Sequence, residues 1–164
     1  MKKILFRTTL LLALMFANLT ASAQQPVKVE DTVKQIVEEY DKVKGVECLT
    51  MDGGIGLGMM KSMFKQKFGK EFMKDVTLIV LINYSNASNE TAAALRKRLE
   101  SFSTVLKEFK LDDSQNKDSY MRCFATLNGQ KSLSDFMVLV EEGDSRMYIY
   151  MGGNLSIEKL DLQL

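Results

Sequence analysis

The chain of 164 residues contains no histidine and no tryptophan, and it has only one proline and two cysteines. The missing imidazole excludes Ser-His-Asp and Cys-His catalysis, HExxH metallopeptidases and nearly every catalytic zinc site, because each uses histidine as base or ligand. Catalysis by carboxylates or by lysine remains open. Because the missing histidine removes most of the familiar hydrolase classes, we predict that the protein is not an enzyme. We also predict no metal site and no cofactor.

The first 23 residues have the pattern of a cleaved export signal. Lys2-Lys3 gives a positive start, the run 10–16 is apolar, and Ala21-Ser22-Ala23 supplies the small residues that signal peptidase accepts. The apolar run is too short to span a bilayer. Cleavage leaves Gln24, and not cysteine, at the new terminus, so we expect neither a lipid anchor nor a transmembrane anchor. The predicted location is periplasmic or secreted.

The rest of the chain has the size and charge of one ordinary domain. Removing the signal leaves 141 residues, a usual length for a single domain. Three of the 22 basic residues leave with the signal, so 19 basic and 21 acidic residues remain. Without a Lys/Arg cluster there is no footprint for nucleic acid, and we expect no such partner. We predict a short flexible leader over 24–30 and a single domain over 31–164.

Apolar residues at helical spacing predict three helices. Asp31 is the expected N-cap of the first, whose apolar stripe starts at Val33 and whose end is expected at Gly45. A third helix begins at a cap on Ser88 or Asn89. Between them lies a short helix with one expected apolar face, formed by Met59, Met60, Met63, Phe64 and Phe68.

Two strands are expected in the first half of the chain. The first is a short run over 46–51, and the second is the continuous apolar run 76–82. A run of this length without polar alternation is typical of a central strand buried on both faces. Helix and strand both remain open for residues 104–111 and 156–164.

The last third of the chain predicts an antiparallel meander. Turns are expected at Asn128-Gly129 and Gly143-Asp144. The strands that they join cover 120–127, 133–141 and 146–151. We therefore predict an α+β fold in a single domain, with a mostly antiparallel sheet of five to six strands and two or three helices packed on one face.

The order of these features also carries a resemblance. An amphipathic helix, a Gly/Met-rich helix and a Val/Ile-rich strand precede the meander, whose sequences include 121–127, 134–143 (SDFMVLVEEG) and 147–157 (MYIYMGGNLSI). Over most of the mature chain this resembles a family of small exported bacterial proteins known only as a domain of unknown function (number 4252).

The resemblance implies an exported protein of the kind common in Bacteroidetes-type bacteria. Members look secreted, periplasmic or lipid-anchored, and their genes often lie near sigma-factor genes, which implies envelope regulation. This chain departs from the lipid-anchored members because Gln24 follows the expected cleavage site. The family has no established activity, so no functional residues carry over.

Cys48 and Cys123 form a candidate disulfide, because both lie in the exported part of the chain. The alternative is a pair of small buried hydrophobes, since each cysteine lies among apolar residues. A disulfide requires Cα atoms within about 7 Å of each other. Both interpretations remain open at this point.

The segment Asp52-Gly53-Gly54-Ile55-Gly56-Leu57-Gly58 lies between a strand and a helix, where a nucleotide-binding loop would lie. Its spacing does not fit, because Met59 or Lys61 stands where the third glycine of GxGxxG is needed. We interpret the segment as a flexible turn.

Five methionines in this region offer thioether sulfurs, which suit Cu(I). They are Met51, Met59, Met60, Met63 and Met73. We favour a methionine-rich core face over a copper site, because Phe64 and Phe68 share the same stripe.

Acidic residues at two turns give an enzymatic alternative. Asp52, or the cluster Glu141-Glu142-Asp144, would have to supply paired carboxylates. Acidic residues at such places are usually solvated turn formers.

Our leading hypothesis is a non-enzymatic binding or regulatory module of the envelope, with an envelope protein or a second copy as partner. The alternative is a small ligand carrier or a carboxylate-based enzyme. A deep pocket with converging polar groups would favour this alternative, whereas a flat apolar sheet face would favour the binding module.

Overall fold

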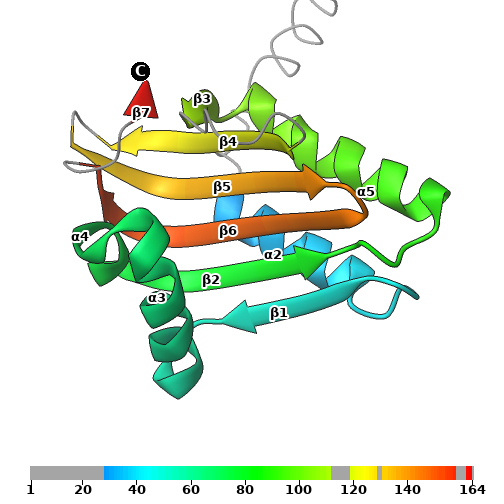
Figure 1. The fold of residues 1–164 in the computed structure, drawn as a ribbon, viewed down its shortest axis with the longest axis horizontal. Helices are drawn as coiled ribbons and strands as arrows, with labels where there is room; N and C mark the ends of the chain where they lie inside the picture. Colours follow the sequence, from blue (N-terminus) through cyan, green and yellow to red (C-terminus); the bar gives the residue numbers. More distant parts are fainter. Residues whose placement is uncertain (1–27, 112–118, 129–130, 158–161, 164) are drawn as a thin grey trace, which may run out of the picture.

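An antiparallel sheet forms the centre of the molecule (Figure 1). The computed structural model describes residues 28–111, 119–128, 131–157 and 162–163, so the expected export signal lies outside the described residues. The strands follow the order β1-β2-β6-β5-β4-β3-β7, and every neighbouring pair is antiparallel. Their bounds are β1 Glu47–Met51, β2 Val76–Asn83, β3 Lys107–Leu111, β4 Ser119–Asn128, β5 Ser132–Glu142, β6 Ser145–Ser156 and β7 Leu162–Gln163. The predicted α+β class is confirmed.

The C-terminal meander forms as predicted. β4 pairs with β5, and β5 pairs with β6 through a register that sets Glu142 opposite Ser145. This register leaves Gly143-Asp144 as a two-residue turn. Gly143 has a φ of 56°, a conformation that glycine adopts without steric cost. The other expected turn, at Asn128-Gly129, lies partly outside the described residues.

The alternation of side chains gives the sheet two apolar faces, which we call the back face and the front face. The back face includes Leu78, Val80, Ile82, Met137, Leu139, Tyr148 and Tyr150. The front face includes Ile79, Phe136, Val138, Ile149 and Met151. Because both faces are apolar, both need a cover that excludes water.

Two helices, α2 (Val29–Tyr40) and α5 (Asn89–Glu100), cover the back face together with the 3₁₀ turn η1 (Ser101–Thr104). Val33 and Ile36 of α2 pack in the same cluster as Leu95 and Leu99 of α5. The predicted cap of α5 is confirmed, because the Ser88 hydroxyl accepts a hydrogen bond from the Thr91 N–H at 3.2 Å.

The bounds of the first helix differ from those expected. α2 begins at Val29, and its N-cap is Lys28 rather than Asp31. The helix starts inside the expected flexible leader because Val29 packs against the back-face cluster. It ends at Tyr40, and not at Gly45, which lies in the following loop.

The helices α3 (Gly54–Phe68) and α4 (Lys70–Lys74) lie on the front face, at the end of the sheet opposite the β5–β6 turn (Figure 1). The rings of Phe68 and Phe72 stack at 5.5 Å, and both meet the Phe136 ring edge-on, at 5.8 and 5.3 Å. Helices therefore cover both faces, whereas packing on one face was expected. The reason is that the front face is as apolar as the back face.

Residues 104–111, for which helix and strand were both open, contain the strand β3. Leu106 packs into the back-face cluster and Phe109 into the front-face cluster. At the other open segment, β6 extends to Ser156, while 158–161 lie outside the described residues. The expected central strand β2 is confirmed between β1 and β6.

Candidate functional site

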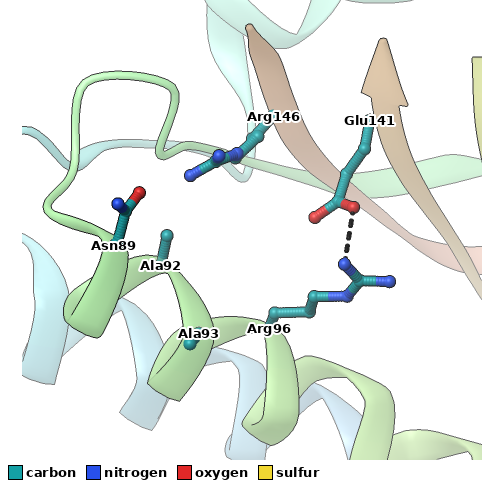
Figure 2. A pocket seen from close by; sticks show the side chains of 6 residues that line it. All are labelled: Asn89, Ala92, Ala93, Arg96, Glu141 and Arg146. Atoms are coloured by element: carbon teal, nitrogen blue, oxygen red, sulfur yellow. Dashed lines mark ion pairs between the residues drawn. The ribbon is translucent and has the colours of Figure 1, made fainter. Parts of the chain in front are cut away.

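A small polar pocket lies between the N-terminal half of α5 and the hairpin of β5 and β6 (Figure 2). It has a volume of about 210 Å³. Its lining residues are Asn89, Ala92, Ala93, Arg96, Glu141 and Arg146. Two of these are alanines, whose methyl side chains leave the space open. Sites for drug-sized ligands usually measure about 300–1,000 Å³, so this pocket suits a small group.

Glu141 is held by two partners at the pocket wall. Its Oε2 lies 2.9 Å from Nη1 of Arg96, and its Oε1 accepts a hydrogen bond of 3.2 Å from the Tyr84 hydroxyl. Burial, aided by the Glu141 carboxylate, raises the pKa of Tyr84 well above its usual range, so the hydroxyl stays a donor. The negative charge of Glu141 is therefore already paired with Arg96, and its other oxygen already accepts a hydrogen bond.

Arg146 contributes a guanidinium that points into the pocket from a fixed main chain (Figure 2). Its N–H donates to the Ser85 hydroxyl at 2.9 Å, and its carbonyl accepts from the Tyr84 N–H at 3.0 Å. Within the described part of the chain, its side chain forms no ion pair. The pocket thus contains one positive charge, on the positioned strand β6, that no described carboxylate pairs with.

A second candidate surface is the uncovered part of the front face, away from α3 and α4, which we call the open face. Its members are Leu49, Leu81, Met121, Val140 and Met147. The register sets Leu49 opposite Leu81 and places Met147 opposite Val140, which in turn faces Met121. Leu49 is 50% exposed and Met147 is 36% exposed, so apolar surface on this face remains in water.

The helix α3 is apolar on its outer side as well. Ile55, Met59 and Met63 are 83%, 64% and 68% exposed, and their four-residue spacing places them on one side of the helix. The expected single apolar face of this helix is therefore wrong in part. Phe64 and Phe68 pack towards the front-face cluster, whereas Met59 and Met63 face solvent.

The five methionines weighed as a Cu(I) site do not share one environment. Met73 is buried, Met51 and Met60 are partly buried against the front-face cluster, and the other two are exposed. In the described ranges, no group of three or more His, Cys, Asp or Glu side chains could hold a metal ion.

The two cysteines lie far apart in the sheet. Cys48 on β1 packs with the back-face cluster, while Cys123 on β4 belongs to the front-face cluster. Three strands separate β1 from β4, so at about 4.8 Å per strand spacing the two backbones are roughly 19 Å apart. A disulfide needs about 7 Å. The two cysteines are not joined in a disulfide, and the geometry does not support the candidate pairing.

The glycine-rich segment is helical where a flexible turn was expected. α3 begins at Gly54 and includes Gly56 and Gly58, although each glycine in a helix interior costs about 1 kcal/mol relative to alanine. The burial of Leu57 in the front-face cluster stabilises the helix and offsets this cost. Only Asp52 and Gly53 remain between β1 and the helix.

The carboxylates considered as a catalytic pair are not brought together. Glu141 lines the pocket, while its neighbour Glu142 lies on the opposite side of the strand because successive side chains alternate. Asp52 and Asp144 are exposed in loops.

The roles of Tyr84, Arg96 and Arg146 were not predicted from the sequence. One signal was present, because a two-residue turn at Gly143-Asp144 implies that Glu141 and Arg146 face each other, as they do. Nothing in the sequence places Arg96 of α5 beside that hairpin.

Comparison of the chain with protein-family models, with curated proteins and with solved structures gave no match. Among the described helices, none combines the length and the apolar character needed to cross a membrane.

Proposed function

We propose that the protein is an exported, non-enzymatic binding module of the bacterial envelope, which docks a protein partner on the open face. The observation that carries this proposal is the partial exposure of its five apolar side chains on an otherwise packed sheet. Contiguous exposed apolar surface commonly marks a site of protein interaction. A flat apolar sheet face favours docking of a protein over enclosure of a small ligand.

The edge of the sheet beside the open face supports the same proposal. Among the described strands, β1 has only β2 as a neighbour, so the outer N–H and C=O groups of β1 face no other described strand of the sheet. An extended segment of a partner can add to such an edge through main-chain hydrogen bonds. Leu49, on this strand, offers an apolar contact next to that edge.

Three sequence features support the proposed exported, non-enzymatic role. The first 23 residues have the export pattern, histidine is absent, and the order of elements resembles the exported family with implied envelope regulation. The alternative of a small ligand carrier has less support, because the pocket beside α5, at about 210 Å³, is smaller than the sites that usually enclose a whole ligand.

Site-specific photocrosslinking in the native cell tests this proposal. A photoreactive amino acid replaces Leu49 or Met147 on the open face, or Ala94 on the exposed side of α5 as the control. We expect a discrete crosslinked protein from positions 49 and 147 and none from 94. Equal crosslinking at all three positions, or recovery of a small molecule without any protein, would contradict the proposal.

A further inference from the structure

We propose that the pocket beside α5 binds a carboxylate group, with the Arg146 guanidinium as its anchor. The lining contains two guanidiniums and one carboxylate, so it has a net charge of one positive unit. Glu141 already pairs with Arg96 and accepts from Tyr84. Arg146 is therefore the cation that a bound anion would neutralise.

The charge and the shape of the pocket select a carboxylate among anions. A single uncompensated charge matches a monoanion better than a phosphate dianion. The planar fork of a guanidinium donates two parallel hydrogen bonds to the two oxygens of a carboxylate. Asn89, on the first turn of α5, adds an amide that can donate a further hydrogen bond.

The site is built before a ligand arrives. The main chain of Arg146 is tied to Tyr84 and Ser85, and Arg96 is tied to Glu141 and Glu100. Positioning of the binding groups lowers the entropy cost of binding. The pocket lies beside α5, away from the open face, so this inference does not depend on the proposed function.

The same carboxylate chemistry has two sources, a small organic acid or a polypeptide. The probes are sodium acetate, an N-acetylated tripeptide with a free C-terminal carboxylate, and the same tripeptide with a C-terminal amide. Sodium chloride at equal ionic strength controls for unspecific screening. Binding of acetate alone assigns the site to small acids, and binding of the free-acid tripeptide, but not the amide, assigns it to polypeptide termini.

The binding is measured by NMR on isotope-labelled protein in the form that the cell produces. We expect saturable shifts in the Nε–H signal of Arg146 and in the amides of Asn89 and Ala93. Arg146→Gln should weaken the affinity at least tenfold, while Lys97→Gln, which removes a charge from an exposed side of α5 outside the pocket, should change it less than twofold.

A second pair of variants keeps the test independent of the arginine. Ala93→Leu fills the pocket from an exposed position and should abolish the shifts, whereas Ala94→Leu, one residue further and outside the lining, should leave them unchanged. The same spectra show whether each variant is folded. The proposal is overturned if neither acetate nor the free-acid tripeptide gives saturable shifts, or if folded Ala93→Leu protein binds like the unchanged chain.

Discussion

Gly45 lies directly against the main-chain carbonyl of Asn86. A Cβ at position 45 would stand 2.1 Å from the Asn86 oxygen, far inside van der Waals contact. Gly45 also has a φ of 84°, in the left-handed region that favours glycine. The contact joins the loop after α2 to the loop before α5, so it ties together the segments that lead to the two back-face helices.

Gly45→Ala should therefore destabilise the fold by about 3 kcal/mol, because backbone strain and steric overlap add. Gly143→Ala is the matched control. Gly143 also has a positive φ, of 56°, but a Cβ there meets no atom within 4 Å, so its cost should be only about 1 kcal/mol. Urea unfolding followed by circular dichroism measures the free energy of unfolding of both variants. Equal losses of stability would contradict the expected steric cost of the Asn86 contact.

Tyr148 and Tyr150 lie two residues apart on the back face, and removal of their hydroxyls should have different effects. The Tyr148 hydroxyl is buried without a hydrogen-bond partner in the described part of the chain, whereas the Tyr150 hydroxyl donates to Asp135 Oδ1 at 2.8 Å. Tyr148→Phe should be neutral or stabilising, and Tyr150→Phe should cost about 1.5–3 kcal/mol. Thermal unfolding measures the stability of the two variants. A larger loss of stability in Tyr148→Phe than in Tyr150→Phe would mean that the Tyr148 hydroxyl does form a stabilising hydrogen bond.

Stability should fall as the pH rises above about 10, the usual pKa of tyrosine. Burial first, and nearby carboxylates second, raise the pKa of Tyr84, Tyr148 and Tyr150 in the folded state. The unfolded chain releases these protons at lower pH than the folded chain, so the stabilisation is complete below pH 10 and is lost above it.

Absorbance at 295 nm follows this titration. Three of the five tyrosines should ionise only together with unfolding seen by circular dichroism. Ionisation of all five in a protein that stays folded would contradict the burial of these hydroxyls.

Cys48 should alkylate slowly at neutral pH and faster as the pH approaches 11. Burial, aided by the charge of Asp41, raises the pKa of the Cys48 thiol to about 11, and the thiolate is the reactive form. Cys123 is almost fully buried and should react only on unfolding. Intact-mass measurement after iodoacetamide treatment counts the modified thiols, and a peptide pair linked through both cysteines would contradict the fold.

Much of the fold follows from local sequence patterns. The two-residue turn at Gly143-Asp144 fixed the register of β5 and β6, and Ser88 marked the start of α5. Such features depend on residues close together in the chain. The start of α3 at Gly54 was not predicted, because its glycines locally favour a turn. The helix is stabilised by the burial of Leu57 in the front-face cluster, a contact with distant residues.

The sequence by itself determined the α+β class, the antiparallel meander and the expectation of export. Only the tertiary structure decided that helices cover both faces, that the cysteines lie on opposite faces, and that Arg96 meets Glu141 beside Arg146. The physical reason is that periodicity tells which residues prefer burial but not against what they pack. Where both faces of a sheet are apolar and α3 is apolar on both sides, contacts between distant segments decide the arrangement.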